Sequence, residues 1–476
     1  MNIYNIIAEL CALVIKNCTE DFFVRYSCVS AAEKARVNEI VRSTVGILFS
    51  EKGEIRPLSK TDLTESFFSD LNQLVASFTE TQDFFAIVGL TQILDEALSL
   101  LLKEKIAEFQ KDDFSVVLNT NREQTGIGLL PRCSCVWERK HRLSHSYNRM
   151  DNFLFNMLLM ENSILGELID KHFFLKNDLF PHFAQTRSLK VAATPLRMER
   201  GFDVIPYSKD KVNYFRIEYK NAGIGAVRSQ NMPDGFDKLN HREDLNALVW
   251  QKILEAAQNR SDIIVFPEML GNPTLADFIS QKIKSLPKDE AEYIPSLIIL
   301  PSFWGEKGNT VTILDRKGNV ICKQKKQNPF RAEVGGESYL EGILSSLVVN
   351  IFHYEGIGRF AVLICKDFLT TKYMEQLMRC FKLTLIIVPS FSTGSYDFRQ
   401  SFDLCAHDDC NVVWINTCAA LEKGKEANFE NIGYVRKRIS RSDDEAQTLC
   451  KMPICAGAFR GECKQDCLYY ETIGGV

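Results

Sequence analysis

Three residues with reactive side chains stand where short apolar segments of strand length end. Glu268 follows the run 263–266, Cys365 follows the run 360–364, and Lys326 ends a predicted hairpin. Functional residues of α/β sheets are often found at such strand ends. A carboxylate, a thiol and an ammonium group can move a proton, attack a carbonyl carbon and stabilise an oxyanion. These three positions are therefore the first candidates for a catalytic site.

Each of these residues also has a structural interpretation that the sequence leaves open. Burial behind Pro267 would raise the pKa of Glu268 and make it a better base, but a carboxylate at a helix start is also stabilised by backbone amides. The lysines near position 326 would equally suit a solvated edge strand. Cys365 precedes a predicted helix, whose N-terminus stabilises a thiolate, yet it is one of 15 cysteines, most of which we expect to be small buried side chains.

Taken together, the order and flanks of these residues resemble the nitrilase, or carbon–nitrogen hydrolase, superfamily, which uses a Glu–Lys–Cys triad in this chain order. The glutamate motif is Val265-Phe266-Pro267-Glu268, the hairpin before the lysine runs from Asn309 to Val320, and the cysteine motif is Ile364-Cys365-Lys366-Asp367. The resemblance covers about residues 220 to 440. It also includes these segments: Ile224–Gln230, Asp244–Ala257, Leu385–Ser390, Ala406–Asp409 and the strand ending at Asn416.

The resemblance implies a role for each member of the triad and a fold for the domain. Glu268 would be the general base, Cys365 the nucleophile that forms a thioester, and Lys326 the cation facing the oxyanion, with the backbone amide of Lys366 as a second donor. The fold would be an α/β, nitrilase-like four-layer αββα sandwich that usually dimerises. Members of this family need no metal, so we expect no metal and no cofactor.

Two features leave alternatives open within that resemblance. The residues around the lysine differ from the usual Tyr-x-Lys of the family, so Lys325 and Lys323 stay alternatives to Lys326. Many members also have a second active-site glutamate past the lysine. Glu337 fits that role best, with Glu333 as the alternative.

The first part of the chain has a different apolar pattern. Through residues 2–169 the apolar residues recur mostly at spacings of three and four, most clearly over 84–106 and 153–168, which predicts helices. Prolines interrupt residues 180–221, which we interpret as a connector with or without short strands. We therefore expect a mostly α-helical N-terminal domain.

We place the domain boundary near residue 210, with the helical domain and connector at 1–210 and the nitrilase-like domain at 211–476. In the second domain, apolar runs of strand length alternate with amphipathic segments, which is typical of an α/β fold with a covered sheet. Helices are expected at Asp244–Ala257 and Tyr373–Phe381. Strands are expected at Ile224–Val227, Ile263–Phe266, Leu297–Leu300, Thr310–Leu314, Phe360–Ile364, Leu383–Val388 and Asn411–Ile415.

Composition excludes several classes of protein. The 476 residues include 61 acidic and 57 basic ones, so the net charge of −4 creates no global cationic field for nucleic acid or an anionic membrane. No apolar run approaches the length that spans a bilayer. The apolar segment 6–15 contains Glu9 and lacks a basic flank before it, so no secretory signal is expected. With an odd number of cysteines, this pattern predicts a cytoplasmic protein without a membrane partner.

Two groups of residues with metal-binding side chains are weaker candidates. One lacks the paired spacing of common zinc sites, and the other lies in a basic segment that we interpret as solvated. The basic run 435–438 with Arg441 is likewise interpreted as surface. We expect no metal at either group. The groups are Cys450, Cys455, Cys463 and Cys467, and Cys133, Cys135, His141 and His145.

The expected function is hydrolysis of a non-peptide carbon–nitrogen bond, in a small-molecule amide rather than a nitrile. A homo-oligomer and a protein partner for the helical half are expected with it. The alternative is a regulatory or scaffold protein whose nitrilase-like domain mediates assembly or responds to a signal. The long helical extension and the unusual lysine neighbourhood favour this alternative, whereas the intact triad favours the enzyme.

Overall fold

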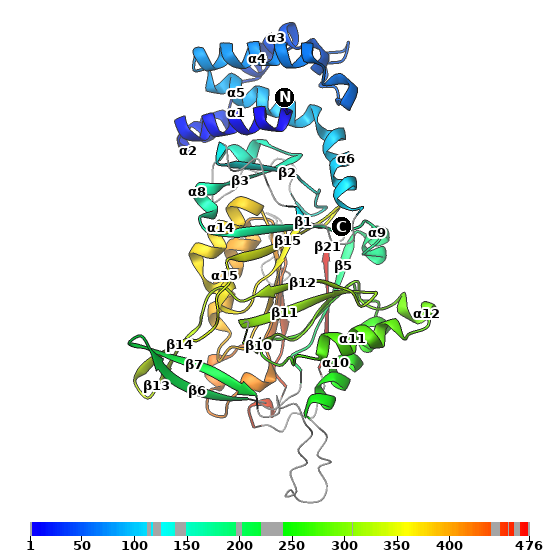
Figure 1. The fold of residues 1–476 in the computed structure, drawn as a ribbon, viewed down its shortest axis with the longest axis vertical. Coiled ribbons are helices and arrows are strands. Elements are labelled where there is room, and N and C mark those ends of the chain that lie inside the picture. Colours follow the sequence, from blue (N-terminus) through cyan, green and yellow to red (C-terminus); the bar gives the residue numbers. More distant parts are fainter. Residues whose placement is uncertain are drawn as a thin grey trace, which may run out of the picture. The chain divides into compact units, whose positions relative to one another are not determined.

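The computed structural model describes the chain except residues 1, 112–115, 118–124, 139–148, 197–201, 220–240, 307, 439–447, 456, 461–466 and 475–476. The chain forms two compact units (Figure 1). Unit one comprises Met1–Lys176, Ile351–Arg359 and Glu375–Thr384. Unit two comprises Asn177–Asn350, Phe360–Met374 and Leu385–Val476.

Unit one begins with helices that share one apolar core. Polar side chains cap several of them: Asn2 accepts from the amide of Tyr4, and Asp83 from that of Ala86. The predicted helix over 84–106 is confirmed, but it divides into two helices bent by 56°. The helices are α1 (Ile3–Asn17), α2 (Glu20–Ser27), α3 (Ala31–Thr44), α4 (Glu65–Glu80), α5 (Phe84–Ala97) and α6 (Ser99–Phe109).

Among the described residues, no single helix has both the length and the apolar character to cross a membrane, and only the bent pair α5 and α6 passes that test jointly. Much of the apolar surface of this pair belongs to the core of unit one.

The predicted helix over 153–168 is wrong. Its middle forms β3 (Met157–Glu161), which pairs antiparallel with β2 (Ile127–Pro131), and only α8 (Asn162–Leu165) is helical beyond one 3₁₀ turn. All residues of β2 and β3 are buried. A strand that is apolar on both faces has no alternation, so its pattern does not differ from that of a buried helix.

The first sheet of unit two carries α10 (His241–Gln258) and α11 (Leu275–Lys284), whose apolar faces share a core with it. Its central strands β5 (Ser188–Ala193), β8 (Ile263–Val265) and β9 (Leu297–Ile299) are parallel. The remaining strands are β10 (Phe303–Gly305), β11 (Gly308–Asp315), β12 (Val320–Lys325) and β21 (Tyr469–Gly474).

The second sheet contributes β16 (Gly358–Val362), β17 (Leu385–Pro389) and β18 (Asn411–Ile415) in parallel, followed by antiparallel β19 (Gly433–Arg436) and β20 (Leu449–Met452). Helix α15 (Tyr396–His407) packs on it, with Phe398 stacked on Trp414 at 4.8 Å between ring centroids. Two sheets that each carry helices confirm the predicted αββα arrangement. The expected strands that lie within the described residues are present, with bounds shifted by at most a few positions.

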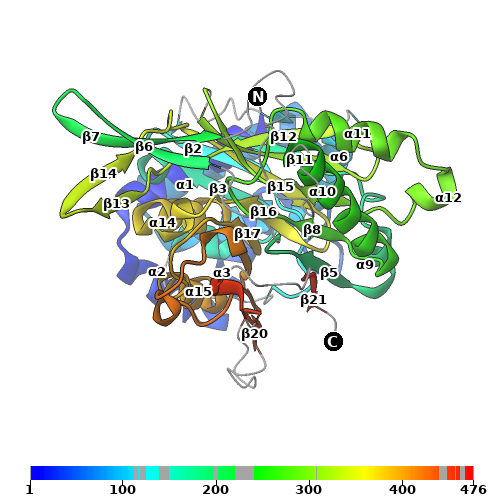
Figure 2. The ribbon, with the colours of Figure 1, turned by 90° about the horizontal axis from the view of Figure 1, so that it is seen from below.

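A separate small sheet was not predicted. Strands β6 (Phe202–Lys209) and β7 (Val212–Tyr219) form a long hairpin within the segment interpreted as a connector. Strand β7 pairs in parallel with β14 (Glu337–Glu341), which pairs with β13 (Arg331–Val334). Figure 2 shows these four strands extending together to one side of unit two.

The two units divide at Lys176 rather than near residue 210. The reason is β5, which pairs with β8 in the middle of the first sheet, with Val191 opposite Ile263. The strand expected at Ile224–Val227 lies outside the described residues. Strands β15 (Val348–Tyr354) and β16 and helix α14 (Thr371–Phe381) have residues in both units.

Candidate active site

Cys365 occupies a strained turn between β16 and the short helix α13 (Lys366–Leu369). Its φ of 47° and ψ of −101° are uncommon for a residue other than glycine, and its amide donates to the carbonyl of Pro389 at 3.0 Å. Its thiol lies 3.9 Å from the carbonyl oxygen of Phe391. Burial and the Glu268 carboxylate raise the pKa of the thiol, while Lys326 acts to lower it.

Glu268 follows β8 and is fully buried. Its Oε1 accepts from Asn309 Nδ2 at 2.7 Å and lies 2.9 Å from Lys326 Nζ, while its Oε2 accepts from the amide of Phe391 at 2.8 Å. Three donors on one buried carboxylate offset the cost of removing the charge from water.

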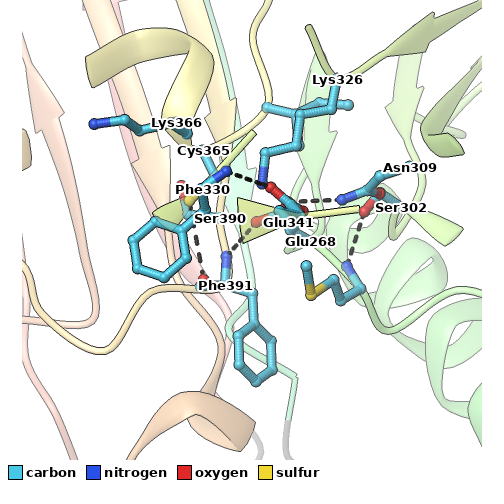
Figure 3. Close-up of polar contacts among 12 residues, drawn as sticks. Glu268, Ser302, Asn309, Lys326, Phe330, Glu341, Cys365, Lys366, Ser390 and Phe391 are labelled. Atoms are coloured by element: carbon cyan, nitrogen blue, oxygen red, sulfur yellow. Dashed lines mark hydrogen bonds and ion pairs between the residues drawn. The ribbon is translucent and has the colours of Figure 1, made fainter. Parts of the chain in front are cut away.

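Lys326 lies directly after β12, and its ammonium group is held between two carboxylates. It is 2.9 Å from Glu268 Oε1 and 2.7 Å from Glu341 Oε2, and all three side chains are buried (Figure 3). Burial acts to lower the pKa of Lys326, but the two carboxylates outweigh it and hold the pKa well above its ordinary value. The ammonium group therefore stays charged at neutral pH.

This geometry distinguishes Lys326 from the two alternative lysines. Lys323 is exposed and Lys325 is half-buried. Consecutive residues of a strand point to opposite faces, so Lys325 and Lys323 share the face that Lys326 does not use. Of the three lysines, only Lys326 reaches Glu268.

The glutamate next to Lys326 is Glu341, which corrects the expectation of Glu337. Glu337 is exposed and accepts from the hydroxyl of Tyr339, and Glu333 is an exposed partner of Arg331. Glu341 ends β14, where its Oε2 also accepts from the amide of Phe330 at 2.7 Å. Burial raises the pKa of Glu341, and Lys326 opposes that rise. Glu268 was selected because it follows an apolar run, whereas β14 has the sequence Glu-Ser-Tyr-Leu-Glu, so this signal does not select Glu341.

Asp367 connects the turn of Cys365 to the loop after Lys326. Its buried carboxylate accepts from the amides of Gln327 at 3.0 Å, Asn328 at 2.7 Å and Ile364 at 3.3 Å. Burial raises the pKa of this carboxyl to about 7. Asn309 and Phe391 also contact Glu268 directly, and no pattern in the sequence singled them out.

Chemically, the site joins one thiol, one cation and two carboxylates. Figure 3 shows Cys365, Lys326 and Glu268 pointing toward one another. Because the thiol has a raised pKa, it rests protonated, and its attack requires a base at hand. The Glu268 carboxylate is in a position to be that base.

Part of the chain is similar to known proteins. The chain is 24% identical over 237 residues to a hydrolase of Schizosaccharomyces pombe, a match that covers 46% of this chain and 70% of the yeast protein. No family model matches the chain.

Among solved structures, an amidase from Nesterenkonia sp. is 12% identical with a TM-score of 0.33, covering 52% of this chain and 82% of the amidase. The NitFhit protein of C. elegans is 13% identical with a TM-score of 0.33, covering 60% of each chain. At these identities and TM-scores the matches carry no argument about this chain, and the activities of these proteins are their own.

The weaker candidates for metal sites lie partly outside the described residues. Within the ranges that the structure describes, no group of three or more His, Cys, Asp or Glu side chains is placed to hold a metal ion. His141, His145, Cys463 and Arg441 lie outside those ranges. Arg436 is buried and donates to Thr448 Oγ1, so this part of the basic run is not solvated surface.

Proposed function

We propose that this chain is a cysteine-dependent hydrolase that cleaves a non-peptide amide, or less readily a nitrile, through a thioester intermediate. The observation that carries the proposal is the buried cluster of Glu268, Lys326 and Glu341 beside the strained turn of Cys365. Burying three charged groups costs desolvation free energy, and such groups cluster at functional sites. Their placement next to a thiol therefore supports a catalytic role.

In the first step, Glu268 takes the proton of Cys365 as the sulfur attacks the amide carbon. Glu268 Oε1 already accepts from two donors and Oε2 from one, so Oε2 keeps room for this proton. A general base of this kind contributes roughly 10²–10⁴-fold to the rate.

The oxyanion that forms on the substrate needs donors. Lys326 Nζ has three N–H groups, of which Glu268 and Glu341 engage two, and the third is assigned to the oxyanion. The amide of Lys366 opens α13 and is assigned as the second donor. Loss of one preorganised donor costs about 2.7–4 kcal/mol of barrier.

The tetrahedral intermediate then expels the amine, which takes the proton from Glu268 and leaves an acyl group on Cys365. Glu268 next takes a proton from a water molecule that attacks the thioester. The acid is released, and the thiol regains its proton. Glu341 keeps Lys326 charged and fixed throughout.

The test is hydrolysis of a panel of small amides and nitriles by the parent protein and by Cys365→Ala. We expect release of ammonia or amine by the parent, and a loss of at least roughly 10³-fold in Cys365→Ala. Cys405→Ala, which removes another buried thiol of unit two, should stay near the parent rate. A Cys365→Ala protein with full activity would exclude the mechanism.

The regulatory or scaffold alternative makes a different prediction for the thiol. It expects Cys365 to react with a thiol-directed amide probe no faster than the other buried cysteines. Self-association and a protein partner for the helical unit stay predictions.

A further inference from the structure

The hydroxyl of Tyr219 bridges two backbone segments next to Glu268. It donates to the carbonyl of Met269 at 3.3 Å and accepts from the amide of Trp304 at 3.1 Å. Met269 directly follows Glu268 in the chain. Tyr219 ends β7, so the bridge joins the small sheet to the loop that carries the base.

The loop at Met269 needs such support because its backbone is strained. Met269 has a φ of 64°, which is uncommon for a residue with a side chain. Its amide donates to Ser302 Oγ at 2.8 Å, and its carbonyl accepts from Tyr219. Hydrogen bonds to both the amide and the carbonyl of Met269 hold the turn in this conformation. They thereby also fix the direction of the neighbouring Glu268 side chain.

The hairpin also supports the second carboxylate of the site. Glu341 pairs with Phe215 of β7, and the amide of Gly342 donates to the carbonyl of Phe215 at 2.8 Å. At the other end of the hairpin, the ring of Phe202 lies 5.3 Å from that of Phe391, whose amide donates to Glu268. One hairpin thus contacts the supports of both glutamates.

We propose that Tyr219 is a positioning residue, whose hydroxyl fixes the turn after Glu268 so that the carboxylate stays on Lys326 and within reach of Cys365. This inference rests on the proposed function, since it assigns Glu268 as the base. Without the hydroxyl, the amide of Trp304 and the carbonyl of Met269 lose a buried partner, and the turn can relax. Small displacements of a catalytic group lower the rate strongly.

The experiment compares Tyr219→Phe with Tyr207→Phe, which removes a hydroxyl from an exposed ring of the same hairpin. Tyr219→Phe should lower kcat by roughly tenfold or more with KM within about twofold of the parent. A less firmly held Glu268 changes its contact with Lys326, so the pH–kcat profile of Tyr219→Phe should differ from that of the parent. Tyr207→Phe should match the parent in all three quantities.

Alkylation of Cys365 by iodoacetamide across pH gives a second readout that needs no substrate. Tyr219→Phe should change this profile, and Tyr207→Phe should not, with both proteins folded by circular dichroism. If both the alkylation profile and the pH–kcat profile of Tyr219→Phe match those of the parent, the positioning role is overturned. If no amide is hydrolysed by the parent but the alkylation profile does change, the proposed function fails while the positioning role stands.

An independent observation concerns two of the cysteines near the C-terminus. Cys455 Sγ and Cys467 Sγ lie 2.9 Å apart, closer than two unbonded sulfur atoms normally rest. Both are partly exposed. Nearby, the hydroxyl of Tyr469 donates to the carbonyl of Pro453 at 2.6 Å, so the segment after β20 and the start of β21 are already joined.

We infer that Cys455 and Cys467 are a site of reversible disulfide formation. The thiolate of one attacks an oxidised low-molecular-weight disulfide such as oxidised glutathione, which releases one small thiol and leaves a mixed disulfide. The second cysteine then displaces the other small thiol. Two protein thiols are oxidised and one external disulfide is reduced. The new bond would link the segment after β20 to the segment before β21, two strands of different sheets.

The test treats the protein with oxidised glutathione and maps its peptides without reduction. A peptide linking Cys455 to Cys467 should form in the parent and in Cys450→Ser. Cys455→Ser and Cys467→Ser should instead retain glutathione on the remaining cysteine. The cross-link should raise Tm by a few degrees. Pairing of either residue with Cys463, or tightly bound zinc in freshly purified protein, would overturn this assignment.

Discussion

Each unit of the molecule contains a buried cluster of ionisable side chains, and the two clusters differ in the groups that lie beside them. In unit one, His172 contacts Asp170 and His353 at 2.9 Å each, and the ring of Phe174 stacks on His353 at 4.3 Å. In unit two, Lys326 links Glu268 and Glu341, and Cys365 adjoins them on a strained turn. Burial and hydrogen bonding are common to both.

The difference shows what makes a buried polar cluster a candidate for catalysis. The histidines lie within β4 (Ile169–Phe174) and β15, where neighbouring rings cover them. Burial, His172 and Arg359 lower the pKa of His353 far below its ordinary value, so it stays neutral. The members of the second cluster follow strand ends and keep opposite charges next to a nucleophile. The position in the sheet and the adjoining thiol therefore distinguish the two clusters.

The largest effect is expected from removing the cation of the second cluster. Lys326→Met leaves two buried carboxylates without their counter-charge, which should lower the free energy of unfolding by about 3–5 kcal/mol and abolish amide hydrolysis. Lys325→Met, on the opposite face of the strand end, should change the free energy of unfolding by only about 0.5 kcal/mol. Urea unfolding followed by fluorescence measures both. Equal losses in the two variants would contradict the role of Lys326.

A smaller effect should separate Glu341 from Glu337. Glu341→Gln removes a negative charge near Cys365 and should lower the pKa of its thiol, so the midpoint of alkylation against pH moves down. Hydrolysis should fall by roughly tenfold to a hundredfold, because Lys326 is held less firmly. Glu337→Gln should alter neither quantity, since Glu337 is exposed. If Glu337→Gln has the stronger effect, the placement of Glu341 is wrong.

The smallest effect concerns the histidines and is confined to stability. Below about pH 6.5 the unfolded chain binds a proton at position 353 that the folded chain does not. Stability is therefore fully present above that pH and falls as pH drops, by at most about 1.4 kcal/mol per pH unit from this residue. His353→Phe should flatten the dependence of unfolding on pH between about 5 and 7 without changing the pH profile of hydrolysis. A dependence as steep as that of the parent would show that His353 is not its source.

The sequence was informative where local pattern and final environment agree. The strand at Asn411–Ile415 has the predicted bounds, because a short apolar run between turn residues leaves few other options. Glu268 and Cys365 were identifiable because each follows such a run. Lys326 could be distinguished from Lys325 only with the geometry, since their order along the chain does not show which face is buried.

Other features depend on contacts between distant segments. Pro206 suggested a connector, yet it lies in β6, an edge strand where its missing amide is tolerated. The hairpin of β6 and β7 supports the site only because β7 pairs with β14, which lies more than a hundred residues later in the chain. Glu341 was missed because β14 is not an apolar run, so its contacts with Lys326 and Phe330 are what identify it.

The most direct test of the central claim is to look for the acyl group itself. The parent protein is mixed with an amide that it hydrolyses, and the reaction is quenched in acid within the first turnover. The protein is then digested, and its peptides are measured by mass spectrometry. A substrate-derived acyl group should appear on the peptide that contains Cys365, and the matching peptide of Cys365→Ala should carry none. Hydrolysis that proceeds with no acyl group on Cys365, or with one on another cysteine, would contradict the claim that this sulfur is the nucleophile.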